Sequence, residues 1–171
     1  CATIAPAGSA WDAQVIAMVA ELKAKTGGKL CIKNYAGGVQ GDEKAVVQKM
    51  RIGQLQCAGL TGFGLGQIAP PVRVLETPFQ FNNGDEIDYV TTKMAPVLNE
   101  AFSKGNPPVV NLGWAEAGFV YIISKDKPIK SLDDLKGVKM WMWEGDPMAE
   151  ALYKRLNVVP IQLSIADVLT S

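Results

Sequence analysis

The segment 131–147 constrains the fold more than any other part of the chain, because two helix-start signals flank a short apolar run. Ser131 followed three residues later by Asp134 is typical of a capping box, and Gly137 suits the end of the short helix that such a box begins. Asp146 followed by a proline is typical of an N-cap and the first residue of a second helix. The residues between these helices are therefore predicted to form a strand, 138–143.

The predicted strand 138–143 carries two tryptophans. Because side chains alternate along a strand, Trp141 and Trp143 should point to one face and the methionines at 140 and 142 to the other, with Glu144 immediately after. Tryptophan is mostly buried whatever its role, so both indoles could belong to a hydrophobic core. They could instead form the wall of a ligand cleft, and the segment alone leaves both interpretations open.

The amino-terminal part of the chain alternates between strand and helix patterns. Strands are predicted at 1–5, 30–35 and 56–61, and Ser9 and Asp42 begin the two helices between them. The first helix is expected to bury a face made of Trp11, Val15, Met18, Val19 and Leu22. A βαβαβ unit of this kind forms a parallel sheet, and ligands bind beyond the carboxyl ends of its strands. The loops that follow these strands are therefore expected to share one rim: 6–9, 37–42 and 62–66.

The remainder of the chain continues the alternation. Its predicted elements are a helix at 85–102, strands at 109–114, 119–124 and 138–143, a helix at 146–156, a strand at 158–163 and a helix capped by Ser164. We expect a hinge in the break near 114–118. The predicted organisation is an α/β protein with lobe I at 1–115 and lobe II at 116–171, both with mostly parallel sheets flanked by helices.

Composition argues against several classes of protein. The 171 residues include 17 basic and 17 acidic side chains, so the chain lacks the electrostatic footprint of a nucleic-acid-binding protein. The most apolar stretch, 107–124, contains Asn111 and Glu116 and is expected to form two strands, not a membrane span. The absence of histidine and of a Cys-x-x-Cys pair argues against a zinc site, and we expect no cofactor.

The three cysteines lie in predicted strands, at positions 1, 31 and 57. Cysteine in such a strand most often acts as a small buried hydrophobe. An odd number leaves at least one thiol unpaired, and the sequence does not decide whether any two of them pair. Cys1 is also compatible with a lipid anchor, although a strand that begins at once leaves no flexible linker.

Several motifs occur in one order along the chain. They are Gly-Gly-Val-Gln-Gly-Asp-Glu at 37–43 with Met-Arg-Ile-Gly-Gln-Leu at 50–55, Thr-Pro-Phe-Gln-Phe at 77–81, Lys-Pro-Ile at 127–129 and Asp-Leu-Lys-Gly-Val-Lys at 134–139. Each motif is weak alone, but their order and spacing resemble those of the substrate-binding proteins of TRAP transporters. The resemblance runs along the whole chain and covers the amino-terminal portion of that family.

The resemblance implies a periplasmic binding protein fold with two lobes, type II-like and here truncated, because the C-terminal parts of both lobes are absent. It implies a periplasmic (extracytoplasmic) receptor, expected to be monomeric, that captures a small organic acid in a cleft between the lobes. The ligand would then pass to the membrane permease subunits of a TRAP-type transporter. Closure would be a hinge motion driven by ligand contacts to both lobes, and no enzyme activity is expected.

The resemblance also implies pocket positions. Glu43, Thr61 and Gly64 occupy those of lobe I, and Val120 and Trp141 occupy those of lobe II. Many family members have arginines at the last two positions, where the second pairs with a ligand carboxylate. Valine and tryptophan predict an aromatic or otherwise apolar organic acid, held by backbone amides. Further candidate contacts are aromatic or acidic: Trp11, Phe63, Glu116, Phe119, Trp143 and Glu144.

Other functions remain open at this point. A cationic or zwitterionic ligand could be enclosed by the indoles and carboxylates, and an ABC-type receptor could share the topology. An enzyme could use Glu76, Glu116 or Glu144 as acid or base, but the chain has no histidine and no Gly-x-Ser-x-Gly elbow. The glycine-rich run 62–66 suggests a nucleotide loop, but it lacks the G-x-G-x-x-G spacing and a following Lys-Ser/Thr.

Overall fold

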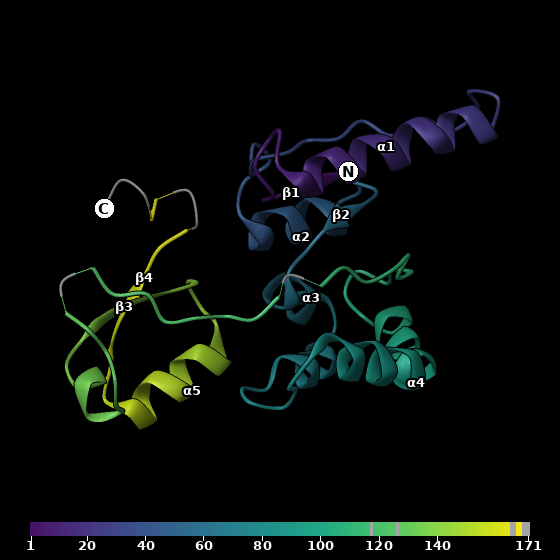
Figure 1. Cartoon of the computed structure of the whole chain (residues 1–171). Helices are drawn as coiled ribbons and strands as arrows, with labels where there is room; N and C mark the ends of the chain where they lie inside the picture. Colours follow the sequence, from purple (N-terminus) through teal and green to yellow (C-terminus); the bar gives the residue numbers. More distant parts are fainter. Residues whose placement is uncertain (117, 126, 165–166, 169–171) are drawn as a thin grey trace. The chain divides into compact units, whose positions relative to one another are not determined.

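The chain divides into two compact units. The computed structural model describes residues 1–116, 118–125, 127–164 and 167–168. Unit 1 comprises Cys1–Trp114 and unit 2 comprises Ala115–Ser171 (Figure 1). The boundary falls within the segment 114–118 where a hinge is predicted, and the movement of that segment stays a prediction.

Unit 1 combines two short parallel strands with helices. Its elements are β1 (Ala2–Thr3), α1 (Ala10–Lys25), α2 (Glu43–Arg51), β2 (Ala58–Gly59), α3 (Gly62–Ile68), the 3₁₀ helix η1 (Pro70–Glu76) and α4 (Gly84–Ser103). Within this unit α1 and α4 lie at opposite ends, with α2 and α3 between them (Figure 1).

The helix starts predicted in the amino-terminal part are confirmed. The Ser9 hydroxyl accepts a hydrogen bond from the Asp12 amide, and the Asp42 carboxylate accepts one from the Ala45 amide at 2.8 Å. Gly27 follows the C-cap of α1 with a φ of 59°, a conformation that glycine adopts without strain. Local capping chemistry therefore decides where these helices begin and end.

The apolar face predicted for α1 is only partly buried. Val15, Val19 and Leu22 are half-buried, whereas Trp11 is 44% exposed and Met18 is 47% exposed. Asp12 is the buried residue of this helix. The spacing of the apolar residues predicted helix α1 correctly, but the described residues cover only part of its apolar face.

The sheet of unit 1 has β1 at its centre. β1 pairs in parallel with β2, with Ala2 opposite Ala58, and Ala2 also forms a bridge to Tyr35. The Tyr35 amide donates to the Cys1 carbonyl at 2.9 Å, and the Thr3 amide donates to the Tyr35 carbonyl at 3.0 Å. The order is that of a βαβαβ unit, as predicted. The predicted strand 30–35 is wrong in extent, because only its last residues reach β1.

Two small hydrophobic clusters stabilise unit 1. The larger joins α2, α3, η1 and α4 and consists of Val47, Ile68, Ala69, Val72, Leu98 and Phe102. The smaller packs β1 against α2 and consists of Ala2, Val46 and Leu55. Each buried Val, Leu, Ile or Phe side chain contributes roughly 1.5–3 kcal/mol. Because α2 supplies Val47 to the larger cluster and Val46 to the smaller, packing holds this helix from both sides.

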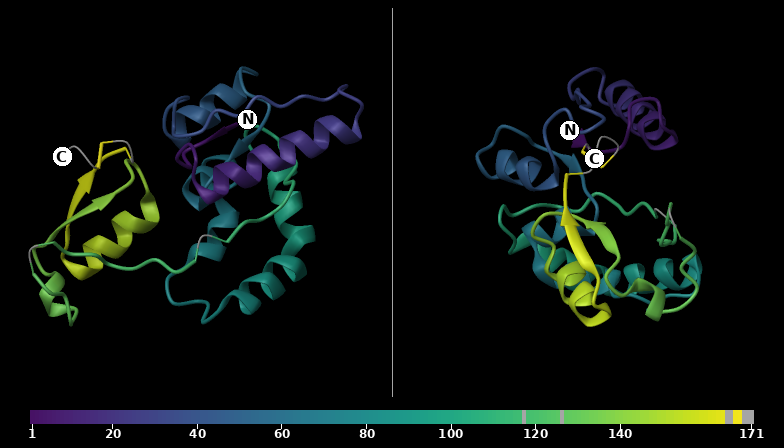
Figure 2. Two further views of the ribbon diagram at one scale, coloured as in Figure 1. Left: turned by 45° about the horizontal axis from the view of Figure 1, so that its top comes forward. Right: turned by 90° about the vertical axis from the view of Figure 1, so that its left-hand side faces the viewer.

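Unit 2 contains a parallel strand pair and a covering helix. Its elements are the 3₁₀ helix η2 (Asp133–Leu135), β3 (Lys139–Met142), α5 (Pro147–Leu156) and β4 (Val159–Gln162). β3 and β4 pair in register, with Trp141 opposite Ile161, and α5 lies beside this pair (Figure 2). Asp146 caps α5 as predicted, since its carboxylate accepts from the Met148 amide at 3.0 Å. The predicted helix after Ser164 falls mostly outside the described residues.

The helix predicted after Ser131 is only a single 3₁₀ turn. The Asp134 carboxylate accepts hydrogen bonds from the Lys130 amide at 3.0 Å and from the amide and hydroxyl of Ser131 at 2.9 Å. These bonds, the Lys130 amide first, hold the pKa of Asp134 below its ordinary value. The predicted capping box is only half formed, because Leu132 is the N-cap of the turn and no side chain caps it. Gly137, with a φ of 70°, follows directly after the turn ends.

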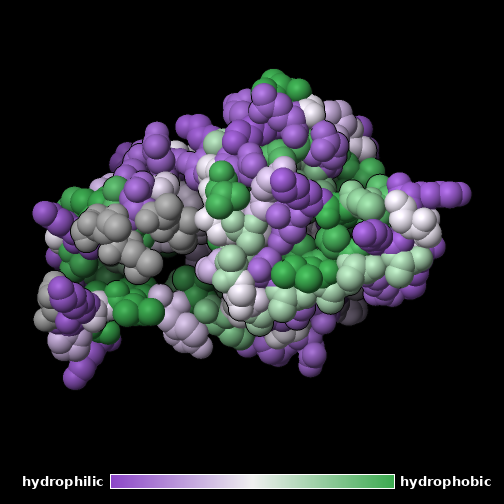
Figure 3. All heavy atoms as spheres, turned by 90° about the horizontal axis from the view of Figure 1, so that it is seen from above, coloured by the Kyte–Doolittle hydropathy of each residue, from purple (hydrophilic) through white to green (hydrophobic). Residues whose placement is uncertain are grey.

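The strands predicted at 109–114 and 119–124 are wrong for the described residues. No ladder forms there, and most of the side chains are exposed, such as Leu112 at 86% and Val120 at 97%. A strand needs a neighbour with which to exchange backbone hydrogen bonds, and none of the described segments forms a ladder with these two. Apolar side chains accordingly reach the surface of the molecule, as the face drawn in Figure 3 illustrates.

This exposure predicts how residues 1–171 behave when expressed alone. Exposed apolar rows of this extent favour association and dye binding. We expect strong fluorescence with 8-anilinonaphthalene sulfonate and a broad thermal transition, and we expect Leu112→Ser with Ile123→Ser to lower the dye signal. A sharp, cooperative melt without dye binding would contradict the prediction.

Candidate functional site

The candidate site of unit 1 is built around a buried carboxylate. Glu43 is the first residue of α2, and its side chain has no solvent exposure. Its Oε1 accepts from the Thr61 amide at 2.6 Å, and its Oε2 accepts from the Thr61 hydroxyl at 2.6 Å and from the Gly64 amide at 2.9 Å. Three donors therefore satisfy the carboxylate, and α2 is fastened to the start of α3.

Burial dominates the electrostatics of Glu43. Removal from water raises its pKa above the ordinary value of 4.5, and the hydrogen bonds from Thr61 and Gly64 act in the opposite direction. The neighbouring Asp42 carboxylate makes a further small contribution that raises the pKa. The group is a positioning residue, because a fully buried side chain has no surface on which to touch a ligand.

The glycine-rich run 62–66 is helical, which corrects its prediction as a loop. A Cβ on Gly64 would lie 2.8 Å from Glu43 Oε2, and one on Gly66 would lie 2.7 Å from the Arg73 side chain. A Cβ on Gly62 would overlap the carboxylate of Glu76, which is paired with Arg73 at 2.7 Å. The glycines therefore allow other side chains to approach the backbone of α3.

This arrangement argues against the nucleotide-loop interpretation. A phosphate loop offers free backbone N–H groups to an anion. Here the amides of Thr61 and Gly64 already donate to the carboxylate of Glu43. Glu76, considered above as an acid or base, belongs to an ion pair with Arg73.

The loops predicted to share a rim do lie together. The Gly37 amide donates to the Ala5 carbonyl at 2.7 Å, which joins the loop after β1 to the loop after Tyr35. Glu43 joins the end of the second loop to Thr61, directly beyond β2. Thr61 is half-buried at this rim, Phe63 and Gly64 are buried behind it, and Trp11 is exposed in the first turn of α1.

The candidate residues of unit 2 centre on the indole pair. The rings of Trp141 and Trp143 lie 4.7 Å apart at an interplanar angle of 59°, so both lie on one face, as predicted. Met142, on the opposite face, is only 2% exposed. Both indoles are half-buried, as is Met140, so Met142 is the buried residue of β3 and the indole face is partly open.

Trp141 is held by two hydrogen bonds. Its indole N–H donates to the Leu163 carbonyl at 3.0 Å, and its backbone carbonyl accepts from the Tyr153 hydroxyl at 2.7 Å. Burial and, after it, the charge of Asp146 raise the pKa of Tyr153 above its ordinary value. Trp141 is thus tied to the residue that follows β4 and to α5.

The remaining predicted residues of unit 2 lie outside its helices and strands. Phe119 is 51% exposed, Val120 is 97% exposed, and Glu116 and Glu144 are exposed. Glu144 follows the indole pair directly in sequence. The structure therefore brings Trp141 and Trp143 together, and it leaves the assignment of the other residues to a ligand site a prediction.

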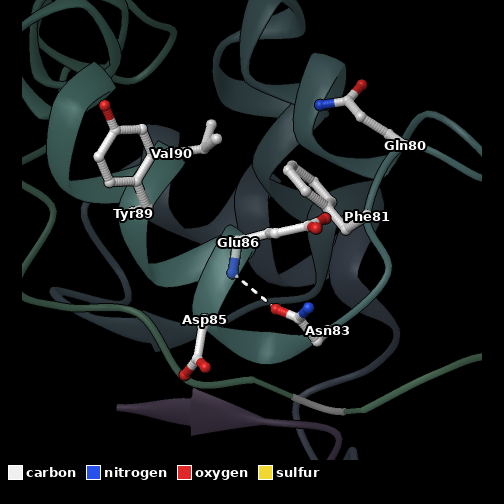
Figure 4. A pocket seen from close by; sticks show the side chains of 7 residues that line it. All are labelled: Gln80, Phe81, Asn83, Asp85, Glu86, Tyr89 and Val90. Carbon is white, nitrogen blue, oxygen red and sulfur yellow. Dashed lines mark hydrogen bonds between the residues drawn. The ribbon is translucent and has the colours of Figure 1, made fainter.

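A shallow depression of about 550 Å³ lies elsewhere in unit 1 (Figure 4). It is lined by Gln80, Phe81, Asn83, Asp85, Glu86, Tyr89 and Val90. The Asn83 side chain accepts from the Glu86 amide at 3.0 Å, and the Glu86 carboxylate accepts from the Asn82 amide at 2.9 Å. These groups cap α4, and none of the candidate site residues lines the depression.

Among the described residues no helix is long and apolar enough to cross a membrane. In the part of the chain that the structure describes, no group of three or more histidine, cysteine, aspartate or glutamate side chains could hold a metal ion.

Two solved structures resemble the whole chain. A TRAP periplasmic solute binding protein from Pseudomonas putida F1, with bound D-glucuronate, is 26% identical with a TM-score of 0.86, over 99% of this chain and 55% of that chain. One from Citrobacter koseri, also with D-glucuronate, is 26% identical with a TM-score of 0.89, over 99% and 56%.

The sequence relatives of the chain are also solute-binding proteins. A solute-binding protein of Verminephrobacter eiseniae is 24% identical over 152 residues, 88% of this chain and 44% of the relative. The C4-dicarboxylate-binding protein DctB of Bacillus subtilis is 26% identical over 145 residues, 82% of this chain and 39% of the relative. The chain spans less than half the length of these two relatives.

Two α/β units with parallel strands, matched over almost their whole length by these structures, define the class as a two-lobed solute-binding protein. The family follows from the sequence match. The chain belongs to the bacterial extracellular solute-binding proteins, family 7 (DctP), whose family model matches residues 1–171.

The buried carboxylate predicts the effect of Glu43→Gln. The amide nitrogen of glutamine would face an N–H or O–H donor where the carboxylate has an acceptor, and this leaves buried donors unsatisfied. We expect a loss of about 1–3 kcal/mol in the free energy of unfolding, measured by urea denaturation of the full-length protein. Glu100→Gln, on the exposed face of α4, is the matched control and should have little effect. Equal effects of the two substitutions would contradict the positioning role.

The raised pKa of Glu43 predicts the pH dependence of stability. The folded state holds this proton more tightly than the unfolded state, so the contribution is fully present below pH 4.5 and is lost as pH rises through the raised pKa. The free energy of unfolding of the wild type, minus that of Glu43→Gln, should therefore fall with rising pH in this window. A difference that rises with pH would show that the carboxylate is stabilised in its charged form.

Proposed function

We propose that the whole protein is an extracytoplasmic receptor that binds a small organic acid between two lobes and delivers it to a TRAP-type membrane permease. The observation that carries this proposal is the family match along the entire chain, together with two likenesses to periplasmic receptors that hold D-glucuronate. Receptors of this kind work by ligand-dependent closure and leave the ligand chemically unchanged.

The indole pair supports a ligand with an apolar or aromatic face. Trp141 and Trp143 present two adjacent rings that are only partly buried, and such rings bind flat or apolar surfaces by stacking. Position 141, where the resemblance implies an arginine in many members, offers an indole whose N–H is already engaged with Leu163. We therefore propose an aromatic or otherwise apolar organic acid, and an acidic sugar such as D-glucuronate is the competing ligand.

In this proposal unit 1 binds the ligand through neutral groups and not through a charged side chain. Glu43, the candidate carboxylate of its rim, is fully buried and already accepts from the amide and hydroxyl of Thr61, so other backbone amides of the rim would face the ligand carboxylate. Neutral donors of this kind bind a carboxylate with little dependence on salt. A cationic or zwitterionic ligand is the second candidate, because Glu116 and Glu144 are exposed in the same unit as the indoles.

Calorimetry of the full-length protein tests the proposed ligand. We expect phenylacetate to bind more tightly than D-glucuronate, with little change in affinity between low and high salt. Trp141→Arg should reverse the preference by adding a positive charge and removing a stacking surface. Tight binding of D-glucuronate by the unsubstituted protein would show that another residue supplies the positive charge, and the apolar-acid assignment would be wrong.

The same experiment separates stacking from packing at position 141. Trp141→Ala should weaken binding of the preferred acid by roughly 1–3 kcal/mol, and Trp141→Phe, which keeps a ring but loses the N–H, should retain most of the affinity. Thermal melts of both variants provide the control. A loss of stability of about 3–5 kcal/mol with unchanged affinity would assign Trp141 to packing alone.

A further inference from the structure

We propose that Cys1 and Cys57 form a disulfide that joins the start of β1 to the start of β2, and that Cys31 stays a free thiol. All three cysteines are thiols in the structure, and Cys1 and Cys57 are both half-buried while Cys31 is exposed. The proposal concerns the covalent state of unit 1 and does not depend on the identity of the ligand.

The strand register places the two residues opposite one another. Ala2 pairs with Ala58 and Thr3 with Gly59 in a parallel ladder, so the preceding pair is Cys1 with Cys57. The Ala2 amide donates to the Cys57 carbonyl at 3.1 Å, which holds the two backbones together at this point. On the other side, the Cys1 carbonyl accepts from the Tyr35 amide at 2.9 Å, so the backbone of Cys1 is fixed from both neighbours.

The spacing on the relevant face suits a disulfide. Side chains two residues apart share a face, so Cys1 and Cys57 lie on the face of Thr3 and Gly59, away from the core face of Ala2. A Cβ placed on Gly59 would lie 3.6 Å from the Cβ of Thr3. Disulfides join Cβ atoms that are about 3.5–4.5 Å apart. Cys1 and Cys57 are the next pair along this face, so their Cβ atoms are expected at the separation that a disulfide requires.

The third cysteine lies outside this arrangement. Ala2 is opposite Tyr35 on the other edge of β1, so Cys1 is opposite position 34 and not position 31. The Cys31 thiol instead donates to the Gly28 carbonyl at 3.6 Å, in the turn that follows α1. The register therefore selects one pair from the three thiols.

The bond forms by thiol–disulfide exchange with a small disulfide such as oxidised glutathione. The Cys57 thiolate attacks one sulfur of glutathione disulfide, which forms a mixed disulfide and releases one glutathione thiolate. The Cys1 thiolate then attacks the Cys57 sulfur and expels the second glutathione thiolate. Two cysteine sulfurs are oxidised, the glutathione disulfide is reduced, and the two protons of the cysteines end on the two glutathione thiols.

The position of the bond predicts what it changes. It would close a loop between residues 1 and 57 and restrict the unfolded chain, which stabilises the folded state. It would lie at the amino ends of β1 and β2, whereas the candidate rim lies beyond their carboxyl ends. We therefore expect a higher melting temperature and unchanged affinity for the ligand.

The experiment is thiol labelling of the full-length protein after equilibration with oxidised glutathione. Treatment with N-ethylmaleimide and mass mapping should find label on Cys31 alone among the three positions, and label on all three after reduction. The oxidised protein should melt about 5–10 °C higher than the reduced protein. Cys31→Ser is the matched control and should keep this shift, whereas Cys57→Ser, or Cys57→Ala if the serine variant does not fold, should lose it.

Several outcomes would overturn the proposal: label on all three cysteines of the oxidised protein, a cross-linked peptide that contains Cys31, or an acyl group on the Cys1 sulfur. Labelling of the wild type alone decides the covalent state, so the result stands whether or not any variant folds. Because no ligand enters the measurement, failure of the disulfide leaves the receptor proposal untouched, and failure of the receptor proposal leaves the disulfide test valid.

Discussion

The buried carboxylate of Glu43 is the interaction on which the geometry of unit 1 depends. A charged group without access to water is costly unless several donors satisfy it, and here Thr61 and Gly64 provide three. The donors come from the end of the strand-to-helix connection after β2, so one side chain of α2 sets the position of that connection. The apolar cluster around Val47, on the same helix, holds α2 in place to do this.

What the sequence predicted well are features that a few neighbouring residues decide. Ser9, Asp42 and Asp146 cap the helices at which they were expected, and alternation in the strand at 138–143 put both indoles on one face. The loops after the strands of unit 1 also gather at one rim, because strand order in a βαβαβ unit follows from connection length and handedness.

What the sequence could not show depends on contacts between distant residues. Three glycines in five positions predict a loop by propensity, yet α3 forms there because Glu43, Arg73 and Glu76 pack against its backbone. The apolar runs at 109–114 and 119–124 have the pattern of strands, but pattern does not provide a neighbouring strand. For the candidate site, resemblance assigned Glu43 to a pocket, and only the structure reveals that its carboxylate faces inward.

The alternation along β3 has a consequence for how specificity can change. Met142 faces the interior while Trp141 and Trp143 share the opposite, partly open face. Folding and surface chemistry are therefore assigned to alternate residues at the end of β3 and directly after it. Substitutions at 141 and 143 can alter what the surface attracts, while Met142 keeps the strand packed. This segment can therefore acquire new binding properties by single changes without passing through a variant that fails to fold.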